Sequence, residues 1–225
     1  MLDADEEALA RAQASVAGIS EEDVRNHEVT WSSDWPSFLD KSELEDLSPT
    51  YARLAGSLRG TIKRGDVFDI ANGVELGEWS GRELLLATFL WGFGNASANR
   101  RATIVPKALA RENDGVISRL FERARTSTGT DAARALHRGD RDHVPELGIA
   151  FGSKFLYFAG FESGGPVPRP LILDEKVAAF LGRKPDVGWY GEYLELMYRW
   201  AQTPGWRVSR VDAIEMAMFL SQQNR

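Results

Sequence analysis

The stretch from Pro145 to Leu181, PELGIAFGSKFLYFAGFESGGPVPRPLILDEKVAAFL, decides the fold and carries most of the functional signal of this chain. A glycine-punctuated turn comes first, an apolar helix is expected over 153–161, and a Gly-Pro loop leads to a second helix from Asp174 to Leu181. Lys154 is expected just inside the first helix and Asp174 at the start of the second, where helix dipoles can tune both groups. This arrangement suits the chemistry of an amine nucleophile assisted by a carboxylate.

Each of the two residues also has an ordinary structural interpretation. A solvated lysine has a pKa of about 10.4 and attacks nothing at neutral pH unless burial or a positive field lowers that value. Lys154 is expected either to be desolvated by its apolar neighbours Phe151, Phe155 and Leu156 or to lie on a solvated helix face, and the residues alone favour neither position. Asp174 reads equally well as a helix N-cap, and the two roles are compatible, because a capping carboxylate is held ionised and in place.

Working outward, the rest of the chain reads as helices separated by glycine and proline. Thr61 to Glu78 is expected to be a loop, and Pro106 is expected to end or kink its helix. Further helices are expected over 49–60, 81–92, 114–126, 131–138, 189–202 and 209–222. Ser80 is expected to cap the helix that follows it, which is apolar nearly all round and belongs in the centre of the fold. Little of the chain reads as strand, so the fold class is mainly α, with two helical lobes around a cleft.

Composition excludes several classes of protein. A chain of 225 residues that is 43% hydrophobic can bury a sizeable core. It has no run of about 18 apolar residues and no secretory start, so we expect a cytoplasmic protein without a membrane span. The absence of cysteine excludes disulfides and thiol nucleophiles. The three histidines (His27, His137 and His143) offer only one nearby pair, so no metal site is expected.

Charge is distributed unevenly along the chain. Residues 1–50 hold thirteen acidic against three basic side chains, a net charge of −10, and the remaining residues carry +4. We interpret residues 1–28 as a solvated and flexible acidic extension, and residues 29–225 as the folded domain. Trp31, Trp35, Phe38 and Leu39 are expected to dock on that domain.

Residues 130–185 resemble the helix-hairpin-helix DNA glycosylases, in particular the 8-oxoguanine DNA glycosylase branch. In that family a hairpin of Leu-Pro-Gly-Val-Gly type precedes a catalytic lysine, and a catalytic aspartate follows about twenty residues later. The matching residues are Gly148 and Gly152 in the hairpin, Lys154, and Asp174 within Leu-Ile-Leu-Asp-Glu-Lys-Val. The hairpin is two residues longer between its glycines than the usual form. We do not expect the amino-terminal β-domain of eukaryotic members, so the chain is more similar to the compact prokaryotic and archaeal members.

The resemblance implies a helix-hairpin-helix at about 131–162 and removal of a modified base that is flipped out of double-stranded DNA. Lys154 would attack C1′ and form a Schiff base, with β-elimination as a further step, and Asp174 would stabilise the transition state. Implied DNA contacts are Gly148, Gly152, Ser153, Arg100, Arg101 and Arg138, with Lys107, Arg134 and Arg141 as further candidates for phosphate. Trp91, Phe93 and Asn95 are candidates for the base pocket, although Trp91 also reads as plain core. The chain is expected to act as a monomer without cofactor or metal.

Several functions stay open at this point. The excised base can be 8-oxoguanine or another modified base, such as a bulky modified cytosine of bacteriophage DNA, which would make the enzyme part of antiviral defence. A catalytically inert helix-hairpin-helix DNA-binding module is an alternative, although such a module needs neither Lys154 nor Asp174. A helical protein–protein adaptor is a third interpretation.

Overall fold

The fold is described from a computed structural model, in which residues 2–16, 19–94, 98–203 and 210–222 are placed. These residues form thirteen α-helices, four short 3-10 helices and one two-stranded antiparallel sheet. The mainly α fold predicted from the sequence is therefore confirmed. No helix in the placed part of the chain is both long and apolar enough to cross a membrane.

The helices, in chain order, have the following bounds: α1 Leu2–Val16, α2 Glu21–Asn26, α3 Trp35–Lys41, α4 Ser48–Leu58, α5 Arg64–Glu75, α6 Gly81–Phe93, α7 Ala98–Ala108, α8 Asp114–Thr126, α9 Gly129–Ala133, α10 Ile149–Gly160, α11 Glu175–Phe180, α12 Tyr190–Ala201 and α13 Val211–Ser221. The 3-10 helices are η1 Glu45–Leu47, η2 Arg111–Asn113, η3 Arg134–Leu136 and η4 Val187–Trp189. Strands β1 (Glu28–Thr30) and β2 (Thr61–Lys63) pair with Val29 opposite Ile62.

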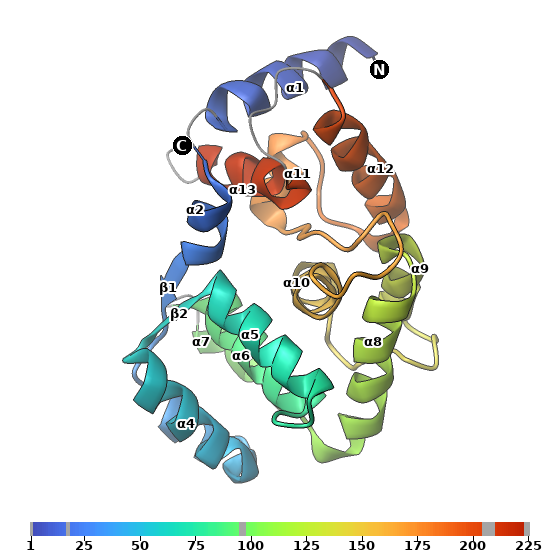
Figure 1. Cartoon of the computed structure of the whole chain (residues 1–225). Helices are drawn as coiled ribbons and strands as arrows, with labels where there is room; N and C mark the ends of the chain where they lie inside the picture. Colours follow the sequence, from blue (N-terminus) through green and yellow to red (C-terminus); the bar gives the residue numbers. More distant parts are fainter. Residues whose placement is uncertain (1, 17–18, 95–97, 204–209, 223–225) are drawn as a thin grey trace.

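Helix α10 lies at the centre of the molecule (Figure 1), with α5, α6, α8 and α9 packed around it. Every residue of α10 from Phe151 to Gly160 is buried, as expected for a helix without a polar face. Helix α6 is equally apolar and begins with the predicted cap: Ser80 accepts from the amide of Glu83, whose carboxylate accepts from the amide of Ser80. Together these two helices bring the apolar middle of the chain into one core.

Two predictions of secondary structure were wrong, one of a loop and one of a helix start, and in both cases a glycine packs closely against another side chain. Residues 61–78 are not a loop: they contain β2 and α5, where Gly73 leaves room for Trp79, whose Cδ1 would lie 2.4 Å from an added Cβ. Helix α10 begins at Ile149 and not at Ser153, because Gly152 is a helical residue that packs against Leu136. In both places a glycine that permits close contact resembles a turn glycine in the sequence.

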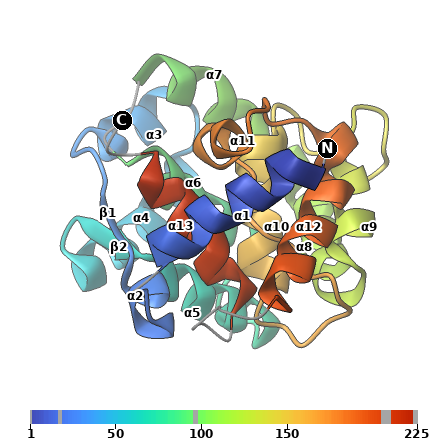
Figure 2. The same cartoon turned by 90° about the horizontal axis from the view of Figure 1, so that it is seen from above.

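The amino-terminal segment is not the solvated tail expected from its charge. Helix α1 lies across α13 (Figure 2), and its residues Ala8 and Ala12 are buried. Helix α2 follows with a capping box formed by Ser20 and Asp23, and buries Val24. This segment therefore combines many acidic side chains with an apolar helix face that packs on the rest of the protein. Trp31, Trp35 and Leu39 are buried and Phe38 packs against the same core, as predicted.

Candidate active site

Lys154 and Asp174 form a direct ion pair. Lys154 Nζ lies 2.8 Å from Asp174 Oδ2, and the two side chains are 8% and 14% exposed. Lys154 projects from α10, and Asp174 precedes α11 after the buried segment 171–173. The twenty-residue spacing in sequence thus becomes a contact, because the loop after α10 returns along that helix. Ser153 secures this return: its hydroxyl accepts from the amide of Leu173 at 3.0 Å.

Asp174 is also the N-cap of α11. Its Oδ1 accepts from the amides of Lys176 and Val177, both at 3.1 Å, while Oδ2 accepts from Lys154. Burial by itself raises the pKa of Asp174, but the charge of Lys154 and the hydrogen bonds from Lys154 and the two amides together place this pKa below its ordinary value. The carboxylate is therefore ionised and fixed in direction at neutral pH.

The surroundings of Lys154 differ from the sequence expectation in one respect. The field of the helix dipole is strongest within the first turn. Because α10 begins at Ile149, Lys154 is the sixth residue of the helix and lies beyond that turn. Apolar contact is what encloses the stem: a Cβ added to Gly92 would lie 3.3 Å from Lys154 Cδ and 2.6 Å from Phe151 Cε1. The missing side chain at Gly92 thus lets α6 pass close to the lysine.

The ion pair opens into a pocket of about 500 Å³. Residues 27–30 line it from the end of α2 and from β1, residues 91–94 from the end of α6, and Phe219 from α13, with Lys154 and Asp174 completing the wall. The predicted base-pocket residues Trp91 and Phe93 are both in this lining, and both are also packed in the core. Asn95, the third predicted residue, lies outside the described residues.

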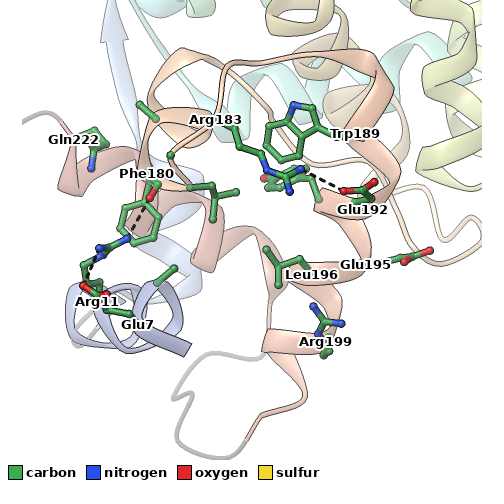
Figure 3. A pocket seen from close by; sticks show the side chains of 15 residues that line it. Glu7, Arg11, Phe180, Arg183, Trp189, Glu192, Glu195, Leu196, Arg199 and Gln222 are labelled. Carbon is green, nitrogen blue, oxygen red and sulfur yellow. Dashed lines mark hydrogen bonds and ion pairs between the residues drawn. The ribbon is translucent and has the colours of Figure 1, made fainter. Parts of the chain in front are cut away.

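A larger pocket, of about 630 Å³, lies between α1, the end of α11 and α12 (Figure 3). It contains neither Lys154 nor Asp174, and two of its arginines already have acidic partners. Arg183 lies 3.3 Å from Glu192, and Arg11 lies 3.4 Å from Glu7. The smaller pocket is the better candidate, because it is the one that holds a buried lysine and carboxylate.

Two of the three hairpin residues predicted to contact DNA are buried. Gly148 is the exposed N-cap of α10, and space around it is open. Gly152 and Ser153 are buried inside α10, where Gly152 contacts Leu136 and Ser153 bonds to Leu173. Both are therefore corrected from DNA contacts to packing residues. Residues 137–148 connect η3 to α10 in the region expected to form the hairpin.

The predicted phosphate-binding arginines fall into two groups. Arg101 is 2% exposed, pairs with Asp34 and stacks over the rings of Trp35 and Phe38, so it holds α7 to α3 and is not available to DNA. Arg100 is exposed and lies 3.3 Å from Glu175, at the start of α11. Arg138 is exposed in the connection before α10. Arg100 and Arg101 are neighbours in α7 and cannot be told apart from the sequence, but only Arg100 is exposed to solvent.

One pocket residue was missed as a functional candidate by sequence reasoning. His27, the residue after α2, lines the pocket together with Trp91 and Phe219, although in sequence it is a lone histidine at the end of an acidic segment. Its only sequence signal is its residue type, which by itself suggests metal binding as readily as base recognition. The contact depends on three segments that are about 60 to 190 residues apart in the chain.

Comparison with known proteins identifies a family. The model of a family described as "putative 8-oxoguanine DNA glycosylase OGG-like protein" matches residues 22–219, which include the whole of the pocket described above. Searches of curated proteins and of solved structures found no match.

Proposed function

This chain belongs to the OGG-like 8-oxoguanine DNA glycosylase family, and we propose that it excises a modified base from double-stranded DNA with Lys154 as the nucleophile. The observation that carries the proposal is the Lys154–Asp174 pair, 2.8 Å apart in a pocket with aromatic walls. A pocket of about 500 Å³ lies within the range of small-molecule sites and is large enough for one flipped base.

The reaction begins with Lys154 as an ammonium group, which must lose one proton before it attacks. The free amine then forms a bond to C1′ of the damaged nucleotide, and the bond from C1′ to the base breaks with its electron pair on the base. The departing base takes up the proton that Lys154 lost. Transfer of a second proton from the new ammonium to the ring oxygen O4′ opens the sugar and leaves a protonated Schiff base.

Asp174 has two roles in this scheme. Its negative charge stabilises the positive charge that develops on the sugar as the base leaves. Its hydrogen bonds with the amides of Lys176 and Val177 hold the carboxylate in one orientation, and the carboxylate in turn orients Lys154. β-Elimination from the Schiff base would nick the strand and make the enzyme a glycosylase with lyase activity.

DNA is proposed to contact the face that carries the start of α10. Gly148 leaves this helix start open, and the free amides of a twelve-residue helix suit a phosphate. Arg138, in the connection that leads to α10, is exposed and adds positive charge, and Arg100, exposed beside Glu175 at the start of α11, is a second proposed contact. Because such contacts release counterions, the affinity for DNA should fall steeply as the salt concentration rises.

Borohydride trapping tests the nucleophile. The protein is incubated with duplexes that each contain one modified base, and borohydride then reduces any Schiff base to a stable covalent adduct. We expect an adduct with the wild-type protein and none with Lys154→Gln. Lys184→Gln is the matched control, because Lys184 is exposed on the loop after α11, and this variant should form the adduct as the wild type does. An adduct that persists in Lys154→Gln would refute the assignment.

The same duplexes identify the substrate. 8-Oxoguanine is the first base to test, because it is the base named in the description of the family. Bulky modified cytosines of bacteriophage type form the second set, and the appearance of abasic sites is measured for each. Base release without any trapped adduct would indicate a glycosylase that uses water, and DNA binding without base release would indicate an inert binding module.

A further inference from the structure

His27 stands in the wall of the proposed base pocket between two aromatic rings. Its ring centroid lies 5.8 Å from that of Trp91 and 5.7 Å from that of Phe219, with interplanar angles of 75° and 78°. The two partners come from α6 and α13, and both line the pocket. Edge-to-face contacts of this kind fix the direction of an imidazole ring more closely than burial alone.

The backbone of His27 is anchored as well. Its carbonyl oxygen accepts from the amide of Arg64 at 2.9 Å and from Trp91 Nε1 at 3.5 Å, and its amide donates to Val24 at 3.4 Å. The residue is therefore held at the end of α2, at the start of the sheet, and against α6. These hydrogen bonds limit how far the main chain at His27 can move when a ligand enters the pocket.

The ring nitrogens of His27 have no hydrogen-bond partner among the residues that the structure describes, although the side chain is half-buried and lines the pocket. Burial, together with the charges of Arg64 and Lys176, lowers the pKa of His27 to about 4. At neutral pH the imidazole is therefore uncharged, with one nitrogen that donates and one that accepts.

We propose that His27 is a specificity-determining residue that forms a hydrogen bond with the polar edge of the flipped base. The inference rests on the proposed glycosylase function and adds to it the residue that recognises the base. The proposed reaction places Lys154 and Asp174, which pair with each other, at the sugar, whereas His27 offers the pocket a neutral donor and acceptor for the base. An uncharged imidazole suits a neutral nucleobase, because it can bond to either a ring N–H or a carbonyl oxygen.

The test compares binding of a base with binding of a site that lacks one. All proteins carry Lys154→Gln, so the substrate stays intact. Duplexes contain either a modified base, 8-oxoguanine first and a bulky modified cytosine second, or a tetrahydrofuran abasic analogue at the same position. We expect His27→Phe to weaken binding of the base-containing duplex by about tenfold, the size of one hydrogen bond, and to change binding of the analogue less than about twofold. His27→Asn, which keeps a donor and an acceptor, should recover part of the loss.

Two results would overturn the proposal. Equal weakening for both duplexes would show that His27 only supports the fold of the pocket, and no weakening for either would show that it does not touch the base. Phe keeps the ring that packs between Trp91 and Phe219, and thermal unfolding of each variant verifies that the fold is intact. If the parent Lys154→Gln protein bound no modified duplex more tightly than undamaged DNA, the proposed function itself would fail, and the role of His27 with it.

Discussion

Replacement of Asp174 should destabilise the fold far more than replacement of Lys154, although the two residues form one ion pair. Asp174→Ala removes two things at once. The cap of α11 is lost, which costs about 1 kcal/mol, and the ammonium of Lys154 is left in a site only 8% exposed. Breaking a buried pair costs about 3 to 5 kcal/mol, and the lower value applies here because the pocket admits water. The expected total is about 4 kcal/mol.

Lys154→Met leaves a much smaller defect. The carboxylate of Asp174 keeps its hydrogen bonds with the amides of Lys176 and Val177, and Met fits the apolar channel between Gly92 and Phe151. We expect a loss of about 1 kcal/mol or less. Asp174→Asn keeps an oxygen for the cap but loses the charge, so it should be less destabilising than Asp174→Ala by about 1 kcal/mol.

Urea unfolding at pH 7, followed by tryptophan fluorescence and by circular dichroism, measures these free energies. Lys154→Met and Asp174→Ala should both abolish the trapped adduct, yet they should differ in the free energy of unfolding. If Lys154→Met lowers the free energy of unfolding as much as Asp174→Ala does, the asymmetry derived from the two backbone hydrogen bonds is wrong. If Asp174→Asn and Asp174→Ala are equal, the capping role is wrong.

Three further predictions concern acid stability, packing and DNA binding. His27 in the unfolded chain takes up a proton near pH 6.5 and in the folded protein only near pH 4, so the free energy of unfolding should fall by at most about 3 kcal/mol as the pH drops from about 6.5 to about 4. Urea titrations across that range should show less of this loss in His27→Phe, and an unchanged profile would contradict the assignment. Gly160→Ala should cost about 1 to 3 kcal/mol, because an added Cβ lies 2.2 Å from a backbone oxygen of α8, whereas Gly148→Ala meets nothing within 4 Å and should be neutral in thermal melts. Arg138→Ala should keep the fold and reduce the salt slope of DNA binding by about one, whereas Arg101→Ala should lower the melting temperature, and the reverse outcome would refute their placement.

Local signals in the sequence predicted several elements closely. Asp114 to Thr126 was predicted as a helix from its amphipathic pattern, and α8 has those bounds. Ser80 was predicted to cap the helix that follows it, and it does so within a capping box that also involves Glu83. Asp174 as an N-cap is confirmed in the same way. Such predictions succeed because both partners lie within one turn of the chain.

Contacts between distant segments explain what the sequence could not predict. Gly152 resembles a turn residue until Leu136 is known to pack on it, and the start of α10 was therefore placed four residues late. Arg101 resembles a phosphate ligand until Asp34, 67 residues away, is seen beside it. His27 is recognised as a pocket residue only once its contacts with Trp91 and Phe219 are known. The catalytic roles of Lys154 and Asp174 stay predictions that the proposed experiments address.

The position of α1 has a practical consequence for anyone who expresses this protein. The family match begins at residue 22, so a domain cut to that boundary would lack α1. Removing the helix would uncover the face of α13 on which Ala8 and Ala12 rest, and α13 is the helix that supplies Phe219 to the pocket. A protein that begins at the boundary of the family match would therefore expose apolar surface and aggregate more readily, and the pocket wall formed by α13 would be less well supported. Truncation and tagging are better designed around the helix than through it.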